Sequence, residues 1–232
     1  MSALSNYPAA GDLTHVMAFD VESSGQNPRK FCMVELAVVV WELGKTEPAD
    51  SLHFYFGLDG RWDERTKKEF WHNAAKGVDG QTPMQVLRER LCKEKTPITA
   101  EAQAAMRLTS WAREWFKKTD GKIMCITDTP GFDYQFITHM LACIEELPGD
   151  MQPPNSLNYL FGKYEPVCDI NSFYKGVGGT LQKWGARDKM HEKFGVQYPE
   201  WVTKHEHNHD PRSDARSIAA KAVYLLSFLN ED

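Results

Sequence analysis

The 232-residue chain has no apolar stretch long enough to cross a lipid bilayer. Its longest unbroken apolar run extends from Leu36 to Trp41, whereas a membrane-spanning helix needs roughly 20 apolar residues. Residues 1–12 lack the basic cluster and the following apolar stretch that mark a secretory signal peptide. We therefore expect a protein without a membrane span, located in the cytoplasm.

Cysteine is scarce, and its distribution does not fit a disulfide framework or a structural zinc site. Such frameworks and sites need paired, closely spaced cysteines. The five cysteines of this chain are scattered and form no Cys-x-x-Cys pair: Cys32, Cys92, Cys125, Cys143 and Cys168. The sequence therefore indicates a reducing compartment in which the thiols are buried.

Internal repeats and low-complexity tracts are also missing. Hydrophobic residues make up 42% of the chain and charged residues 25%, an ordinary globular composition that excludes wholesale disorder. We expect one domain over residues 1–232, with residues 1–12 as an N-terminal tail. The net charge of −5 is unfavourable for contacts with phosphates, unless several of the acids bind divalent cations.

Hydrophobic periodicity predicts strands first, and then alternating helices and strands. Residues 15–20, 31–41 and 51–57 are predicted as strands with short connections, which favours an antiparallel meander. The clearest helix covers 99–118, with Thr99 as its cap and Gly121 after its end. The other expected elements are a polar, helical region over 63–95, strands over 122–127 and 166–170, and helices over 132–146 and about 212–229. This order indicates an α/β fold built on a mixed sheet.

Two acids and a polar turn stand at the end of the first predicted strand. Asp20 and Glu22 are two residues apart, so in a strand their carboxylates point to the same face. Such a pair is unfavourable unless a cation lies between the two groups. The backbone amides of Ser23, Ser24 and Gly25 could contact a phosphate or a sugar hydroxyl. Taken alone, the pattern also fits two solvated acids at a strand end.

Further acids stand near the starts of two predicted helices. Asp133 follows Phe132, where a negative charge meets the favourable end of the helix dipole. His209 lies on a loop, and Asp214 lies in the first turn of the last helix. In isolation, each acid could equally be an ordinary helix-capping group. Three closely spaced histidines also leave open a zinc cluster: His205, His207 and His209.

The order of these motifs, an acid pair, an aromatic–Asp pair and His-x4-Asp, resembles the DEDD superfamily of 3'-to-5' exonucleases. The likeness is to the DEDDh subgroup, in which histidine is the fifth residue, and it covers nearly the whole chain. The stretch from Trp71 to Lys76 also looks like the segment after strand three in RNase T-like proteins and phage exonuclease A. The resemblance implies a ribonuclease H-like fold, in which helices flank a five-stranded sheet whose first three strands are antiparallel.

Matched position by position, the resemblance also implies a site. Its metal-binding carboxylates would be Asp20, Glu22, Asp133 and Asp214, and its histidine would be His209. The tyrosine subgroup would have Tyr where this chain has Asp210. Two departures leave alternatives open. Asp128 stands where the family often has Asn and is a rival ligand, and His207 could replace His209 if the loop register differs.

The implied activity is a metal-dependent 3'-5' exonuclease that hydrolyses phosphodiester bonds at the 3' ends of single-stranded RNA or DNA. It would release nucleoside monophosphates by a two-metal-ion mechanism with Mg²⁺ or Mn²⁺, two ions per site. His209 would accept the proton of the attacking water. A homodimer whose second subunit supplies basic surface is also implied.

Substrate contacts are predicted for the polar turn and for aromatic side chains. Ser23, Ser24, Gly25 and Phe132 would contact the terminal nucleotide, and Trp62, Trp71 or Trp201 could stack on a base. Basic stretches over 61–68, 88–95 and 183–193 are candidate phosphate-binding surfaces, although acids interrupt each one as on ordinary solvated helices. The alternative to an enzyme is a non-catalytic ribonuclease H-like module that binds nucleic acid or acts as a scaffold.

Overall fold

The computed structural model describes residues 12–145, 167–178, 186–195, 197–205 and 208–229. Its centre is a five-stranded sheet with the order β3-β2-β1-β4-β5. The strands are β1 (His15–Ser23), β2 (Met33–Glu42), β3 (Asp50–Tyr55), β4 (Ile123–Thr127) and β5 (Cys168–Asp169). β1, β2 and β3 are antiparallel, whereas β4 is parallel to both β1 and β5. The predicted antiparallel meander and the predicted mixed α/β sheet are therefore confirmed.

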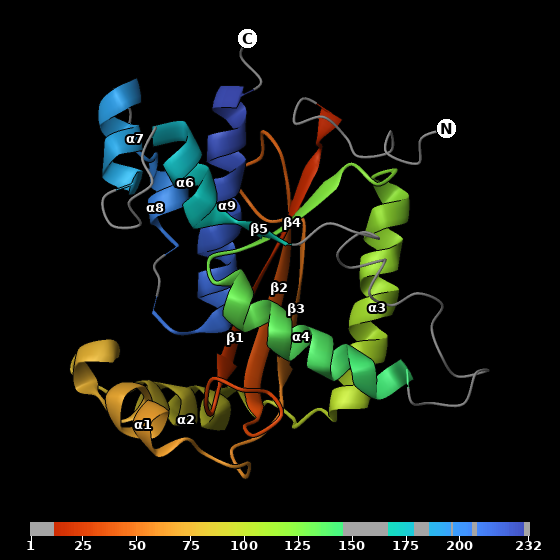
Figure 1. Cartoon of the computed structure of the whole chain (residues 1–232), viewed down its shortest axis with the longest axis vertical. Coiled ribbons are helices and arrows are strands. Elements are labelled where there is room, and N and C mark those ends of the chain that lie inside the picture. Colours follow the sequence, from red (N-terminus) through yellow and green to blue (C-terminus); the bar gives the residue numbers. More distant parts are fainter. Residues whose placement is uncertain (1–11, 146–166, 179–185, 196, 206–207, 230–232) are drawn as a thin grey trace.

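Helices cover both faces of this sheet (Figure 1). On one face, Met17, Phe19 and Val21 of β1 pack in a core that includes α3 (Glu101–Lys118) and α4 (Pro130–Glu145). On the opposite face, Val16 and Ala18 pack in a core that includes α9 (Pro211–Leu229). Because both faces are covered, β1 is buried almost continuously instead of alternating between buried and exposed residues.

The terminal helix α9 packs against the sheet with a buried face that contains several small side chains. Ala215, Ala219 and Ala222 are buried in the core that α9 shares with β1 and β2. Interaxial distances depend on the size of the side chains at the contact, so alanines let the helix approach closely. The first turn of α9, which carries Asp214, is thereby brought beside the end of β1.

The polar region after β3 forms several short helices and one longer helix. These are α1 (Glu64–Thr66), the π-helical segment η2 (Lys67–Trp71), the 3-10 segment η3 (Ala74–Lys76) and α2 (Pro83–Glu94). Trp71 is buried and donates from Nε1 to the carbonyl of Ser23, at a distance of 2.9 Å. This bond attaches the region to the end of β1, and α1 and α2 lie together at that end of the sheet (Figure 1).

The remaining helices are α6 (Ile170–Gly178), α7 (Ala186–Phe194) and α8 (Glu200–Thr203). One local prediction was wrong: Thr99 does not cap α3. The N-cap is Ala100, which makes no side-chain capping bond. The Thr99 amide instead donates to the carbonyl of Tyr55 at 2.7 Å, because the chain there continues the edge of the sheet beside β3. Within the residues covered by the structure, no helix is both long and apolar enough to traverse a bilayer.

Candidate active site

The end of β1 carries two buried carboxylates. Asp20 and Glu22 lie in the part of β1 that pairs with β2 opposite Ala37 and Glu35. They have the same parity as Val16 and Ala18, so their side chains lie on the α9 face of the sheet. The strand register shifts between Glu22 and Ser23, a bulge of the kind that often ends pairing beside an active site.

Asp133, in the first turn of α4, is held by three donors. Its carboxylate accepts bonds from the Val21 amide at 3.3 Å, from the Thr129 hydroxyl at 2.9 Å and from the Thr127 hydroxyl. The side chain is buried. Because the donors come from β1, from the end of β4 and from the turn before α4, the position of this carboxylate is set by three segments.

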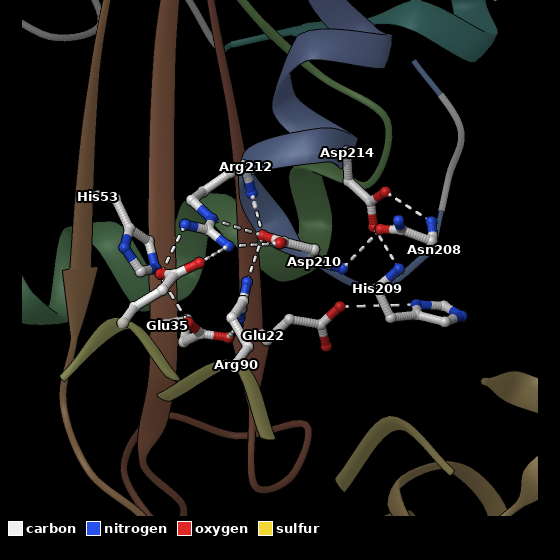
Figure 2. A network of polar contacts seen from close by, with 10 residues as sticks. Glu22, Glu35, His53, Arg90, Asn208, His209, Asp210, Arg212 and Asp214 are labelled. Carbon is white, nitrogen blue, oxygen red and sulfur yellow. Dashed lines mark hydrogen bonds and ion pairs between the residues drawn. The ribbon is translucent and has the colours of Figure 1, made fainter. Parts of the chain in front are cut away.

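Asp214 and His209 are joined by the loop before α9. The two oxygens of the buried Asp214 accept bonds from the backbone amides of Asn208 at 2.9 Å and His209 at 3.0 Å (Figure 2). His209 Nδ1 lies 3.5 Å from Glu22 Oε1. Its ring makes a T-shaped contact with the ring of Phe70, with the ring centroids 4.6 Å apart. Its backbone has a φ of 61°, in the left-handed region that residues other than glycine seldom adopt.

These elements surround a cavity of about 360 Å³. The lining residues that bear on its chemistry are Asp20, Glu22, Ser23, Gly25, Arg65, Thr66, Phe70, Asp128, Phe132, Asp133 and His209. Two sets of potential metal ligands have donor atoms within 4.8 Å of one another. One set is Asp20, Asp128 and Asp133, and the other is Glu22, His209 and Asp214.

The crowding of acids raises the pKa values of the buried carboxyl groups. Burial, followed by the charges of Asp133 and Glu22, raises the pKa of Asp20 well above its ordinary value. Burial and the charge of Asp214 likewise raise the pKa of Glu22, although Arg90 opposes this shift. Burial raises the pKa of Asp133 to about 7, against the lowering effect of the Thr127 and Thr129 hydrogen bonds. The cavity therefore favours a positive charge.

A divalent cation fits this donor set. Asp20 Oδ2 is buried and accepts no hydrogen bond from any residue that the structure covers, which is costly for an ionised carboxylate. Carboxylate oxygens are the ligands that Mg²⁺ and Mn²⁺ prefer. A cation among these acids would balance their charge and supply the missing partner for Asp20.

The predicted substrate-contact residues divide into two groups. Ser23, Gly25 and Phe132 line the cavity, whereas Ser24 does not. The Ser24 hydroxyl donates to the carbonyl of Arg61 at 2.5 Å and accepts from the Cys32 amide at 2.9 Å. It therefore connects the end of β1 to the segments around Cys32 and Arg61.

The tryptophans proposed for stacking lie in hydrophobic contacts outside the cavity lining. The Trp71 ring is in edge contact with those of Trp62 and Phe70. Trp201 packs against Trp41 and Tyr224.

The histidines of the third motif do not gather into one metal site among the residues that the structure covers. His205 makes an edge contact with the ring of Trp41 and belongs to neither set of potential ligands. His207 lies outside the described residues, so its rivalry with His209 stays a prediction. Of the three histidines, His209 is the one that lines the cavity.

Sequence reasoning missed several residues around this site. The basic stretch over 61–68 supplies Arg65 to the cavity wall, but Phe70 was not singled out. Phe70 belongs to the π-helical segment η2, and such segments frequently occur at functional sites. The ion-paired network of Arg90, Glu35 and Asp210 beside His209 (Figure 2) was also missed, although Arg90 lies in the stretch 88–95 that was predicted to bind phosphates. Their spacing along the chain gives no signal, because each is meaningful only next to its partner.

The fold is similar to that of known 3'-exonucleases. The structure of a 3'-exonuclease with 3'-end specific recognition of histone mRNA stem-loop aligns with 97% of this chain and 68% of its own, at 16% identity and a TM-score of 0.54. A full-length 3'-exonuclease aligns over 94% of this chain at 18% identity and a TM-score of 0.52. Exonuclease I aligns over 93% at 13% identity and a TM-score of 0.50.

This chain spans 62% of the full-length 3'-exonuclease and 43% of exonuclease I. No protein-family model and no curated protein sequence matches it. The structural similarities, together with the strand order, identify a ribonuclease H-like fold. The resemblance to DEDDh 3'-5' exonucleases is thus confirmed at the level of the fold.

Proposed function

We propose that the protein is a metal-dependent 3'-5' exonuclease that hydrolyses phosphodiester bonds at the 3' ends of single-stranded RNA or DNA. One observation carries this proposal. Carboxylates from β1 and α4 line one cavity together with the imidazole of His209, and Asp214 of α9 forms a set of potential ligands with Glu22 and His209. A buried oxygen of Asp20 lacks a protein partner among the described residues. Hydrolysis at a 3' end would break the bond between phosphorus and the 3' oxygen and release a nucleoside 5'-monophosphate.

Asp20, Glu22, Asp133 and Asp214 would hold two divalent cations, Mg²⁺ or Mn²⁺. When bound, such ions supply a nucleophile at neutral pH and stabilise negative charge on the reacting phosphate. His209 would take the proton of the attacking water. A proton on Nδ1 directed at Glu22 leaves Nε2 as the basic atom of the ring.

The residues around the acids suit a nucleotide. Ser23 and Gly25 line the cavity, where the Ser23 hydroxyl donates to the Gly25 carbonyl at 2.5 Å. Phe132 also lines it and has an aromatic ring on which a base could stack. Arg65, which also lines the cavity, could pair with a phosphate, since its present partner is the exposed carboxylate of Glu69. A non-catalytic module would need none of the four carboxylates, and this chain has kept them all.

The test uses 3'-to-5' shortening of 5'-end-labelled single-stranded RNA and DNA with Mg²⁺, with Mn²⁺ or with EDTA. Wild-type protein should shorten at least one substrate stepwise, and EDTA should abolish the reaction. Asp20→Asn keeps the size of the side chain but removes the charge, so the rate should fall by about 100-fold or more. Circular dichroism and Tm should show that the fold is retained.

Asp79→Asn provides the matched control, because it makes the same chemical change on an exposed turn whose φ of 52° suits asparagine. Its rate should stay within about twofold of wild type, as expected for an exposed surface substitution. Binding of both nucleic acids without any shortening would favour the scaffolding alternative and contradict the proposal.

A further inference from the structure

The loop that carries His209 needs external support. The left-handed backbone of His209, with a φ of 61°, is unfavourable for a residue with a side chain. Such a conformation persists when the surrounding contacts over-determine it. One support is Asp214, which accepts the amides of Asn208 and His209. Asp210, the residue that follows His209 in the sequence, provides a second support.

Asp210 is held by two arginines from different directions (Figure 2). Arg212 donates to it from Nε at 3.0 Å and from Nη2 at 2.8 Å, and Arg90 of α2 forms an ion pair with its Oδ1 through Nη1. The Asp210 amide also donates to Asn208 Oδ1 at 3.0 Å. Although burial raises the pKa of Asp210, the bonds from Arg212 and the charge of Arg90 lower it to about 2.

Arg90 connects this loop to strand β2 of the sheet. Its other terminal nitrogen, Nη2, bonds to Glu35 of β2, which is the residue paired with Glu22 across the sheet. Glu35 is 1% exposed and is fixed from its other side by His53 Nε2 at 2.9 Å. Arg90 itself is 11% exposed. One guanidinium therefore contacts two carboxylates, one in the sheet and one directly after His209. Its Nη2 donates a hydrogen bond to Glu35, whereas its Nη1 forms an ion pair with Asp210 without hydrogen-bond geometry.

A second, more exposed connection runs beside it. Arg212 donates to Glu94 of α2 at 2.9 and 3.1 Å, with side chains that are 30% and 38% exposed. Glu94 is one helical turn after Arg90 on the same helix. Exposed ion pairs contribute little, whereas breaking a buried pair leaves an uncompensated charge. Glu94 thus offers a matched comparison for Arg90.

We propose that Arg90 is a positioning residue, which sets the His209 imidazole beside Glu22 by clamping Asp210 against Glu35. This inference rests on the proposed function for its catalytic consequence, but the clamp itself can be measured without nucleic acid. Arg90 does not line the cavity, but its charge also acts on Glu22. A test in a His209→Ala background therefore separates an effect through His209 from one on Glu22.

The first measurement is amide hydrogen exchange by NMR in metal-free protein. Arg90→Met should speed exchange at Asn208, His209 and Asp210 by about tenfold or more, since their bonds open when the loop is released. Arg90→Met combined with Glu35→Gln removes both buried charges and guards against a variant that fails to fold. Glu94→Gln should leave these amides close to wild type. Unchanged exchange in both Arg90 variants would overturn the proposal.

The second measurement is a double-mutant cycle on hydrolysis. Arg90→Met should lower kcat by roughly tenfold with little change in KM. In a His209→Ala background the same substitution should lower kcat by less than about twofold, because the group it positions is gone. An equal loss in both backgrounds would identify a general structural effect and contradict the positioning role. If wild-type protein hydrolyses neither RNA nor DNA, the proposed function fails, and the exchange data alone decide on the clamp.

Discussion

The buried acids of the cavity differ in how far the protein has already engaged them. Asp133 accepts bonds from the Val21 amide and from the Thr127 and Thr129 hydroxyls, and Asp214 accepts bonds from the amides of Asn208 and His209. Asp20 Oδ2 is buried among like charges and, of the atoms that the structure covers, finds no donor. A preorganised cation site needs carboxylates that are oriented by hydrogen bonds and oxygen atoms that are available to the ion. This group of acids meets both requirements.

At Asp128 the family resemblance and the geometry lead to different expectations. The family often has Asn at this position, whereas the geometry makes Asp128 a potential metal ligand. It belongs to the same set of potential ligands as Asp20 and Asp133, and it lines the cavity. If Asp128 helps to hold a cation, Asp128→Asn should raise the Mg²⁺ concentration for half-maximal activity by about 10-fold or more. The measurement is the rate of shortening as a function of Mg²⁺ concentration.

Thr129→Val serves as a comparison, since it removes a hydroxyl within hydrogen-bond distance of both Asp128 and Asp133 without removing a charge. Its effect on the Mg²⁺ requirement should be smaller than that of Asp128→Asn. An unchanged Mg²⁺ requirement for Asp128→Asn would show that Asp128 lies near the site without contributing to it.

At the scale of the elements, the turn after β1 depends on one close approach. A Cβ placed on Gly25 would lie 2.4 Å from the Phe31 ring and 2.9 Å from Asp63 Cβ. The neighbouring backbone is fixed there as well, because the Asp63 amide donates to the Ser24 carbonyl at 2.9 Å. Glycine therefore lets the α1 region approach the end of β1 and form one wall of the cavity.

Gly25→Ala should lower the free energy of unfolding by about 1–3 kcal/mol, the usual cost of overpacking. Urea denaturation gives this quantity. Gly131→Ala is the control, since a Cβ there would meet nothing within 4 Å and the residue lies in α4. That variant should be unchanged or up to ~1 kcal/mol more stable. Equal destabilisation by both alanines would contradict the role of the close approach.

At the scale of the whole molecule, folding buries acids close together, and this disfavours the charged form of a carboxyl group. In the unfolded chain Asp133 has an ordinary pKa near 3.8, whereas burial raises its pKa in the folded protein to about 7. The folded protein thus binds this proton more tightly than the unfolded chain. The stability that Asp133 contributes is fully present below about pH 4 and is lost as the pH rises through about 7.

Asp133→Asn imitates the protonated carboxyl group, and the Thr127 and Thr129 hydroxyls can donate or accept. In EDTA, the variant should match the Tm of wild type near pH 4 and exceed it increasingly up to about pH 8, by roughly 2–4 °C for each ~1 kcal/mol. Differential scanning calorimetry over this range measures the difference.

Excess Mg²⁺ should remove or reverse this advantage at pH 8, because the cation stabilises the folded wild-type protein. Asp79→Asn again serves as the control, and its Tm should follow that of wild type at every pH. A Tm difference between Asp133→Asn and wild type that does not vary with pH would contradict the raised pKa of Asp133.

The sequence alone determined the order of the strands and helices, because periods of apolar residues and punctuating glycines and prolines are local signals. It also offered Asp20, Glu22, Asp133, His209 and Asp214 as candidates, since the order of their motifs along the chain resembles that of the DEDDh exonucleases. The positions of Phe70, Glu35 and Arg90 beside the site, in contrast, were decided by the tertiary structure. Their significance comes from partners that folding brings from β2, α2 and the loop before α9, and no local pattern encodes a charge that is balanced across 55 positions of sequence.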